Sequence, residues 1–161
     1  MIRHATASDA AAICEIWNDA IRKTTATFTT QEKERDDIIG LVENSPVFVL
    51  QDEDAKIAGF ATYGPFRSGP GYVDVAEHSI YLSAQSRRSG HGRKLLSHTV
   101  KHAFENGIRI LIAGIGGENT NAEEFHAAMG FDKVGHMPAI GSKFGRHHDL
   151  IFMQKNLAAP D

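Results

Sequence analysis

The chain has one cysteine among its 161 residues, Cys14, so it cannot form an internal disulfide, and this favours a reducing compartment. It has no apolar run as long as a membrane span, and its first residues, Met1 to Thr6, lack the apolar segment of a signal peptide. A basic excess is also missing: 17 Lys and Arg stand against 20 Asp and Glu, for a net charge of −3. These absences predict a cytoplasmic protein that binds neither membranes nor nucleic acids.

The composition is ordinary for a soluble globular protein. Hydrophobic residues make up 42% of the chain and charged residues 23%. The length suits one domain, residues 1–161, and neither an internal repeat nor a linker divides it. We therefore expect one domain with a substantial hydrophobic core.

The hydrophobic periodicity predicts the order β-α-α-β-β-β-α-β-α-β-β. This order favours an α/β fold, in the sense of an α+β mixed sheet with helices on both faces. Thr6 or Ser8 caps the first helix, and Thr29 with Glu32 resembles a capping box for a second helix that ends near Asn44. The last two strands are expected at 132–137 and 149–156, with a loop at 138–146 between them.

The segment 80–96 combines a strand end, a basic turn with glycines, and the start of an amphipathic helix. Backbone N–H groups are unpaired at a helix N-terminus and favour an anion, and glycines permit close approach of a phosphate. The spacing Arg87-x-x-Gly90-x-Gly92 therefore predicts a diphosphate site, although a basic surface turn is the alternative. The candidate ligands are Arg87, Arg88, Ser89, Gly90, His91, Gly92 and Arg93.

Several short motifs accompany this turn: Thr27-Phe28, the segment 77–82, Asn119 seven residues before His126, Gly130-Phe131, and the segment 141–146 with Asp149 behind it. Together they resemble the GNAT superfamily of acetyl-CoA-dependent N-acetyltransferases, and more narrowly its phosphinothricin and methionine sulfone N-acetyltransferase group. The likeness covers nearly the whole chain. Two positions depart from the group's pattern, because Ala122 stands where Ser is common and His147 where Trp is usual.

The resemblance implies a homodimeric enzyme that uses acetyl-CoA as co-substrate, requires no metal, and acetylates a small amino-acid-like amine without an acyl-enzyme. Phosphinothricin, methionine sulfone, methionine sulfoximine and ordinary amino acids are all open as acceptors. The pantetheine arm is expected to pair with the strand at Ile80, Tyr81 and Leu82, as an added half-strand does. Asn119 is expected to bind the same arm, and its alternative role is a helix cap.

Glu77 is the candidate general base. An amine near neutral pH is mostly ammonium and must lose a proton before it attacks, and a carboxylate at the strand centre can accept that proton. The alternative is a solvated or salt-bridged glutamate. His126 is the candidate acid for the leaving thiolate, because histidine donates protons near neutral pH; the alternative is a core histidine that a backbone group satisfies.

The acceptor pocket is expected to contain Phe28, Arg67, Glu77 and Lys143. Phe28 supplies an apolar wall, and a cation at 67 or 143 binds the acceptor's carboxylate. The alternative for each cation is a solvated surface residue.

Three other interpretations are weaker. His98 and His102 have the i, i+4 spacing of a zinc pair but lie off the apolar stripe, and adjacent residues such as His147 and His148 point to opposite faces of a strand. A dinucleotide fingerprint at Gly114-x-Gly116 fails, because residue 119 is Asn. A coenzyme-binding or sensing module that has lost catalysis is the alternative function.

Overall fold

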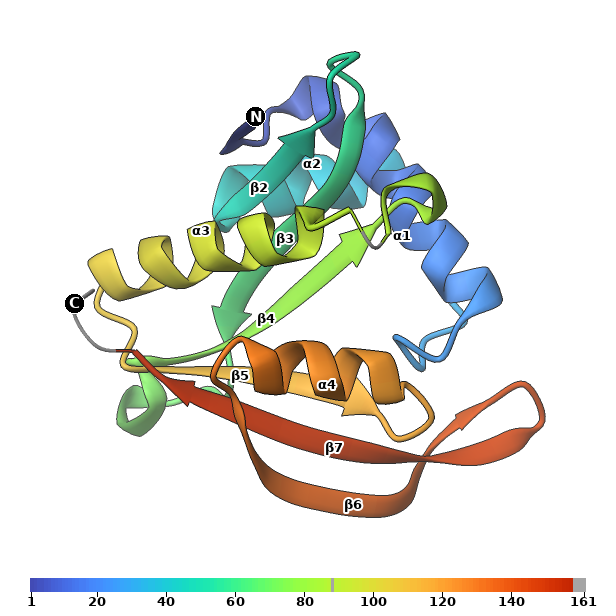
Figure 1. Cartoon of the computed structure of the whole chain (residues 1–161), viewed down its shortest axis with the longest axis vertical. Coiled ribbons are helices and arrows are strands. Elements are labelled where there is room, and N and C mark those ends of the chain that lie inside the picture. The colour runs from blue at the N-terminus through green and yellow to red at the C-terminus, as the bar shows by residue number, and fades with distance from the viewer. Residues whose placement is uncertain (88, 158–161) are drawn as a thin grey trace.

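The computed structural model describes residues 1–87 and 89–157. Strands and α-helices follow one another along the chain in the order predicted from the sequence (Figure 1). The strands are β1 (Ile2–His4), β2 (Val47–Gln51), β3 (Ile57–Pro65), β4 (Val75–Leu82), β5 (Ile110–Gly116), β6 (Asp132–Lys143) and β7 (Arg146–Asn156). The α-helices are α1 (Ala10–Lys23), α2 (Arg35–Asn44), α3 (His91–Glu105) and α4 (Thr120–Ala128).

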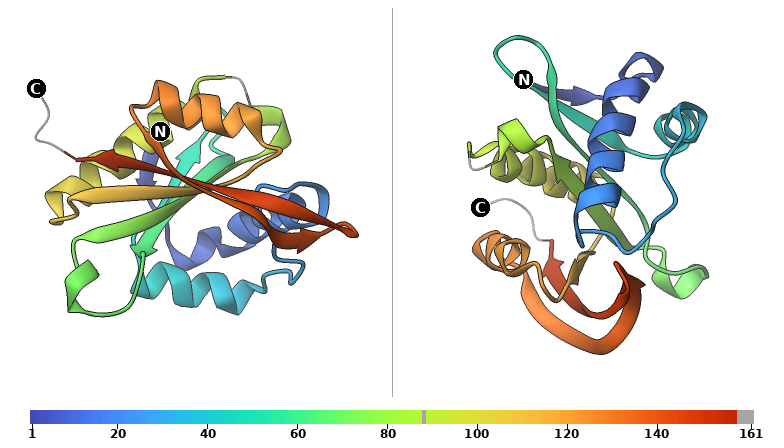
Figure 2. Two further views of the ribbon diagram at one scale, coloured as in Figure 1. Left: turned by 90° about the horizontal axis from the view of Figure 1, so that it is seen from below. Right: turned by 90° about the vertical axis from the view of Figure 1, so that its right-hand side faces the viewer.

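The strands form one seven-stranded sheet in the order β1-β2-β3-β4-β5-β7-β6. Only the β4–β5 pair is parallel among the described pairs, so the sheet is mixed. Helix α3 makes the crossover that a parallel pair requires. Helices α1 and α2 lie on one face of the sheet, and α3 and α4 lie on the other (Figure 2, left). The predicted α/β fold with a mixed sheet and helices on both faces is confirmed.

Each face of the sheet has its own hydrophobic core. On the α1–α2 face, Ile13 and Ile38 pack against Val49 and Phe60. On the α3–α4 face, the core includes Leu95 and Leu96 of α3 together with Phe48, Leu111 and Phe131. Along β2, alternate residues face opposite cores: Val47 and Val49 face the α1–α2 side, and Phe48 and Leu50 face the α3–α4 side.

The parallel pair at the centre of the sheet separates into a fork. Strands β4 and β5 are in register only from Val75 opposite Ile110 to Glu77 opposite Ile112. Beyond Glu77, β4 continues to Leu82 and β5 to Gly116, and Figure 1 shows the two strands diverging. The facing backbone edges of the two strands are therefore unpaired with each other in the open part of the fork.

The start of the second helix was predicted wrongly. Helix α2 begins at Arg35, where the Glu34 side chain and the Asp37 side chain form the capping box. Thr29 instead accepts a hydrogen bond from the N–H of Gln31, at 3.1 Å, in a local turn. Residues 24–34 are consequently an irregular loop between α1 and α2, and Cys14 donates a hydrogen bond from its thiol to Lys33 O in that loop.

The prediction of a loop at 138–146 is also wrong. Residues 132–156 form one long hairpin that turns at Phe144 and Gly145, which have φ of 54° and 72°. The strand continues through Pro138 because its register with β7 shifts there. In this bulge, Asp149 accepts a hydrogen bond from the Ala139 N–H at 2.8 Å.

In the described part of the chain, no helix combines the length and the apolar character needed to cross a membrane.

Candidate active site

The turn after β4 leads directly into an uncapped helix N-terminus. Gly90 is the N-cap of α3 and has φ 77°, a left-handed conformation that glycine adopts without strain. No side chain caps this end, and the first intrahelical bond is from the Lys94 N–H to Gly90 O. The N–H groups of the first turn therefore point out of the helix, as an anion-binding site requires.

The side chains of this turn also suit a diphosphate. Arg87 and Arg93 are exposed, and Ser89 donates a hydrogen bond to Ser86 O at 2.6 Å, which closes the turn. His91 has a buried Nδ1 atom without a hydrogen-bond partner among the described residues. An orphaned buried nitrogen beside free backbone N–H groups fits a phosphate ligand. Arg88 lies outside the described residues.

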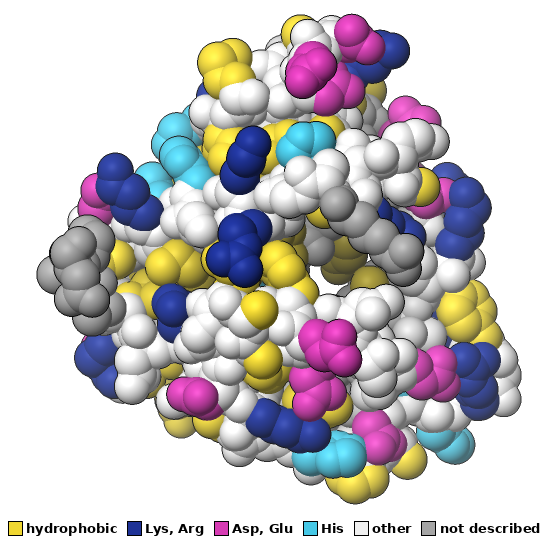
Figure 3. Space-filling model, viewed as in Figure 1, with side chains coloured by type: hydrophobic (Ala, Val, Ile, Leu, Met, Phe, Trp, Pro, Cys, Tyr) yellow, Lys and Arg dark blue, Asp and Glu magenta, His cyan; other side chains and the backbone are white. Residues whose placement is uncertain are grey.

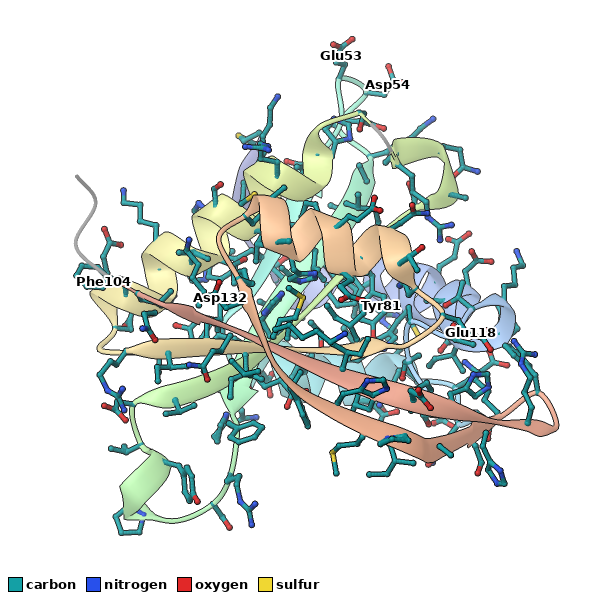
Figure 4. The ribbon with its side chains drawn as sticks, turned by 60° about the horizontal axis from the view of Figure 1, so that its bottom comes forward. Glu53, Asp54, Tyr81, Phe104, Glu118 and Asp132 are labelled. Atoms are coloured by element: carbon teal, nitrogen blue, oxygen red, sulfur yellow. The ribbon has the colours of Figure 1, made fainter. Side chains whose placement is uncertain are left out.

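The strand before the turn offers a free backbone edge. Ile80 and Leu82 pack into the α3–α4 core, and Tyr81 packs on the opposite face with its ring 5.6 Å from that of Trp17. Burial raises the pKa of Tyr81, and Figure 4 shows this residue in the interior of the molecule. The three side chains thus anchor the strand, while the open fork leaves its edge free for a ligand with amide groups. Figure 3, drawn from the same side as Figure 1, shows a hollow at this position with hydrophobic side chains on its walls.

Asn119 is the N-cap of α4, which was the alternative considered for it. Its Oδ1 accepts a hydrogen bond from the Ala122 N–H at 3.2 Å. The cap occupies the oxygen of the side chain, and the described hydrogen bonds include none from its amide nitrogen. The nitrogen can therefore still donate to a ligand in the fork.

Glu77 lies where the fork opens. Its side chain is on the α1–α2 face, and a Cβ atom at Gly114 of β5 would lie 3.2 Å from its Oε1. Burial raises the pKa of Glu77, and the described hydrogen bonds and salt bridges include none to its carboxylate. A half-buried carboxylate without a protein partner is suited to accept a proton from a ligand.

Both ring nitrogens of His126 are engaged by other groups. Its Nδ1 lies 2.7 Å from Ala122 O, and its Nε2 lies 3.1 Å from Nε2 of His78. His78 in turn contacts Ile112 O through Nδ1 at 3.1 Å. The carbonyl contacts require a hydrogen on each Nδ1, so the two Nε2 atoms share no hydrogen while both rings are neutral.

Burial disfavours the charged form of both histidines. It lowers the pKa of His78 to about 3 and also lowers that of His126, and each residue is only 5% exposed. The arrangement resembles the alternative of a core histidine held by backbone more than that of a free acid. Proton donation from His126 to a leaving thiolate remains a prediction, and it requires one of these contacts to break.

Phe28 forms a wall near Glu77. Its ring packs against Gly141 and Gly116 and stacks on His148, with centroids 5.6 Å apart and planes inclined by 22°. Gly114 and Gly116 are two residues apart on β5 and share a face, so Glu77 and Phe28 lie along the same side of that strand. The structure thus brings together two of the predicted acceptor residues.

The two predicted cations do not join them as free ligands. Lys143 is 4% exposed, and its Nζ donates hydrogen bonds to Thr24 O and Thr27 O at 2.6 and 2.8 Å. Arg67 lies over the ring of Tyr72, on the wall of a cavity of about 510 Å³ that Glu77 does not line. A role for Arg67 in binding the acceptor therefore stays a prediction.

Sequence reasoning did not place Gly114, Gly116, Gly141 and His148 around Glu77 and Phe28. The signal for the first two was present, because a glycine within an apolar strand commonly marks a close approach by another group. At Gly116 an added Cβ would lie 2.5 Å from Thr25 O. His148 is buried while His147 is exposed, as strand alternation predicts.

The described residues contain no group of three or more His, Cys, Asp or Glu side chains that could hold a metal ion. His102 instead hydrogen-bonds the Tyr63 hydroxyl through Nδ1 at 2.9 Å.

The chain is similar to known proteins over nearly its whole length. A profile of the acetyltransferase (GNAT) domain matches residues 2–152. The chain is 37% identical to the L-amino acid N-acyltransferase MnaT of Escherichia coli, over 97% of this chain and 93% of that protein. It is also 37% identical to the L-methionine sulfoximine/L-methionine sulfone acetyltransferase of Salmonella typhimurium, over 99% and 98%. A phosphinothricin acetyltransferase from Sinorhizobium meliloti, solved in complex with acetyl-CoA, superposes with a TM-score of 0.93 at 34% identity, over 98% and 88%.

Proposed function

Because the chain belongs to the acetyltransferase (GNAT) domain family, we propose that it acetylates the amino group of a small amino-acid-like acceptor, of the class of methionine sulfone, methionine sulfoximine or phosphinothricin. The observation that carries this proposal is Glu77: its carboxylate is half-buried and lacks a partner among the described residues, and it lies at the opening of the β4–β5 fork beside the Phe28 wall. Acetyl-CoA, when bound, supplies the activated acetyl thioester.

The coenzyme side of the site is assigned to the fork and the turn. The N–H groups of the first turn of α3, with Arg87, Arg93 and His91, would hold the diphosphate. The free edge of Ile80 to Leu82 and the amide nitrogen of Asn119 would hold the pantetheine arm.

The acceptor side is assigned to the α1–α2 face. Glu77 takes the proton from the acceptor's ammonium group, so that the nitrogen can form a bond to the acetyl carbon as the C–S bond breaks. Phe28 packs against the acceptor's side chain. The raised pKa of Glu77 makes the carboxylate a stronger base than a solvated glutamate.

We also propose that the protein is a cytoplasmic homodimer. β6 is an edge strand with three large exposed apolar side chains, Val134, Met137 and Ile140, and the exposed Phe144 follows it in the hairpin turn. Such an edge favours association. Cys14 is a free thiol, as a reducing compartment allows. Light scattering coupled to gel filtration tests the dimer.

The test of the function is thiol release from acetyl-CoA with a panel of acceptors: the two methionine derivatives, phosphinothricin and ordinary L-amino acids. We expect acceptor-dependent release that is fastest for one member of this class, with N-acetylation confirmed by mass spectrometry. Tight binding of acetyl-CoA without acceptor-dependent release would support the alternative, a coenzyme-binding module that has lost catalysis.

A further inference from the structure

A buried cation on the hairpin holds the loop that carries the acceptor wall. Lys143 is the last residue of β6, is 4% exposed, and forms no salt bridge among the described residues. A buried charge without a counter-ion must be compensated by dipoles. Here the dipoles are the carbonyl groups of Thr24 and Thr27, which Nζ contacts at 2.6 and 2.8 Å. Thr24 is the C-cap of α1, where the helix dipole also favours a cation.

The two carbonyls precede Phe28 in the irregular loop 24–34. Without regular hydrogen bonding of its own, this loop depends on contacts to the rest of the molecule for its position. The contacts are close: Thr25 O lies over Gly116, and the Phe28 ring lies over Gly141. Lys143 therefore fixes the backbone at the point from which the Phe28 side chain projects.

The carbonyl group of Lys143 supports the same wall from its other side. Nε2 of His148 donates a hydrogen bond to Lys143 O at 2.9 Å, and this bond orients the buried imidazole that stacks on Phe28. The ammonium end of Lys143 holds the loop, and its backbone holds the ring beneath the wall. Lys143 thus contacts both the loop that carries Phe28 and the imidazole on which Phe28 stacks.

We propose that Lys143 is a positioning residue that sets the acceptor affinity by holding Phe28 in place, rather than a ligand of the acceptor's carboxylate. The proposal rests on the proposed function for its kinetic test, because Phe28 is taken there as the acceptor wall. It adds that Lys143 affects acceptor affinity through the packing of Phe28 on the acceptor's apolar side chain, and not through the acceptor's carboxylate.

The kinetic test compares Lys143→Met with Lys155→Met. Lys155 is a matched control, because its Nζ donates to Met129 O at 2.8 Å, beside the C-terminus of α4 and away from the acceptor wall. We expect Lys143→Met to raise the acceptor KM by about tenfold, as the loss of charge-assisted hydrogen bonds would. The KM for acetyl-CoA should stay within about twofold, and Lys155→Met should change neither constant by more than this.

A double-mutant cycle with Phe28→Ala separates positioning from direct binding. If Lys143 acts through Phe28, Lys143→Met should add little to the acceptor KM of Phe28→Ala. An equal increase in both backgrounds would mean that the ammonium contacts the acceptor itself, and the proposal would be overturned.

Hydrogen exchange supplies a readout that does not depend on activity. We expect the amides of residues 25–30 to exchange faster in Lys143→Met than in the parent protein and in Lys155→Met. Unchanged exchange in this loop overturns the proposal even if catalysis suffers. If the parent protein acetylates no member of the acceptor panel, the proposed function fails, and the exchange experiment still decides whether Lys143 holds the loop.

Gly116→Ala provides a second variant if Lys143→Met does not fold. Its Cβ would lie 2.5 Å from Thr25 O, so it displaces the loop while Lys143 stays intact. We expect it to reproduce the higher acceptor KM and the faster exchange of residues 25–30. A Gly116→Ala protein with parental values for both quantities would contradict the link between loop position and acceptor affinity.

Discussion

The coenzyme half and the acceptor half of the site are built by different means. The coenzyme half is nearly continuous in sequence, from β4 through the turn to α3, and its ligands are mainly backbone groups. The acceptor half assembles side chains from the α1–α2 loop, β4, β5 and the β6–β7 hairpin, and Lys143 contacts Thr24 across 119 residues of chain. A backbone-built site depends on local conformation, whereas a site built from side chains depends on tertiary packing.

The two halves also differ in where they keep their charges. Arg87, Arg93 and Lys94 of the coenzyme half are exposed to solvent. In the acceptor half, burial raises the pKa of Glu77 and lowers the pKa of Lys143, so both groups are disfavoured in their charged forms. Figure 4 shows Glu118 beyond this interior, on the side of the molecule where it pairs with the exposed Arg146. The charged forms of Glu77 and Lys143 therefore lower the stability of the folded protein.

Glu77→Gln should have the largest effect and is the sharpest test of this division. We expect kcat to fall by about 10² to 10⁴, the usual contribution of a general base, while the dissociation constant of acetyl-CoA changes little. The carboxylate is the active form, so kcat of the parent protein should fall as the pH drops through the raised pKa of Glu77. Initial rates across a pH series and calorimetric coenzyme binding measure both quantities.

Stability should change in the opposite direction from activity. A carboxyl group with a raised pKa stabilises the folded state below its unfolded pKa, and this contribution is lost as the pH rises through its folded pKa. Above the folded pKa the ionised Glu77 is therefore unfavourable, and there Glu77→Gln should raise the free energy of unfolding. Glu105→Gln, at the exposed end of α3, is the control for a general loss of charge. An unchanged kcat in Glu77→Gln would remove the base role.

Gly90→Ala tests the backbone-built half. Gly90 has φ 77° and Gly107 has φ 83°, at opposite ends of α3, and neither has a neighbour that an added Cβ would meet. Both substitutions should cost about 1–2 kcal/mol of stability, because alanine is strained in the left-handed region. Only Gly90→Ala should also weaken acetyl-CoA binding, by about tenfold, because it shifts the free N–H groups of the first turn.

Denaturant unfolding and calorimetric binding compare these two glycine variants. If Gly107→Ala weakens the coenzyme as much as Gly90→Ala does, the effect belongs to the stability of α3 and not to the turn. The acceptor KM should be unchanged in both variants, since the acceptor half lies on the other face of the sheet.

The contrast between the halves also explains how much could be predicted from the sequence. The fold, the strand before the turn and the helix after it were predicted because their hydrophobic periodicity and glycine punctuation are local. Asn119 was predicted with both of its roles, and its cap is visible in the structure. These features depend on residues within a few positions of one another.

Most of the wrong predictions concern features that depend on contacts between residues far apart in the sequence. Asn18 and Lys143 hold the loop before α2, at Lys33 and at Thr27, and no residue near Thr29 signals these contacts. The capping box of Glu34 and Asp37 is itself local and was overlooked. The strand β6 continues past Pro138 because Asp149 of the neighbouring strand supports the bulge. The burial of Lys143 and the pairing of His126 with His78 likewise depend on partners far along the chain.

Arg87→Ala should have the smallest effect, and its salt dependence sharpens the comparison further. Arg87 is exposed, so its attraction for a diphosphate is screened by solvent and by ions. We expect the KM for acetyl-CoA to rise about two- to fivefold at low ionic strength and the difference to shrink at about 1 M salt. Arg35→Ala, another exposed arginine at the start of α2, should leave this constant unchanged at both salt concentrations. An effect of Arg87→Ala that persisted at high salt would mean a buried contact with the coenzyme, and the coenzyme half would then depend on side chains as the acceptor half does.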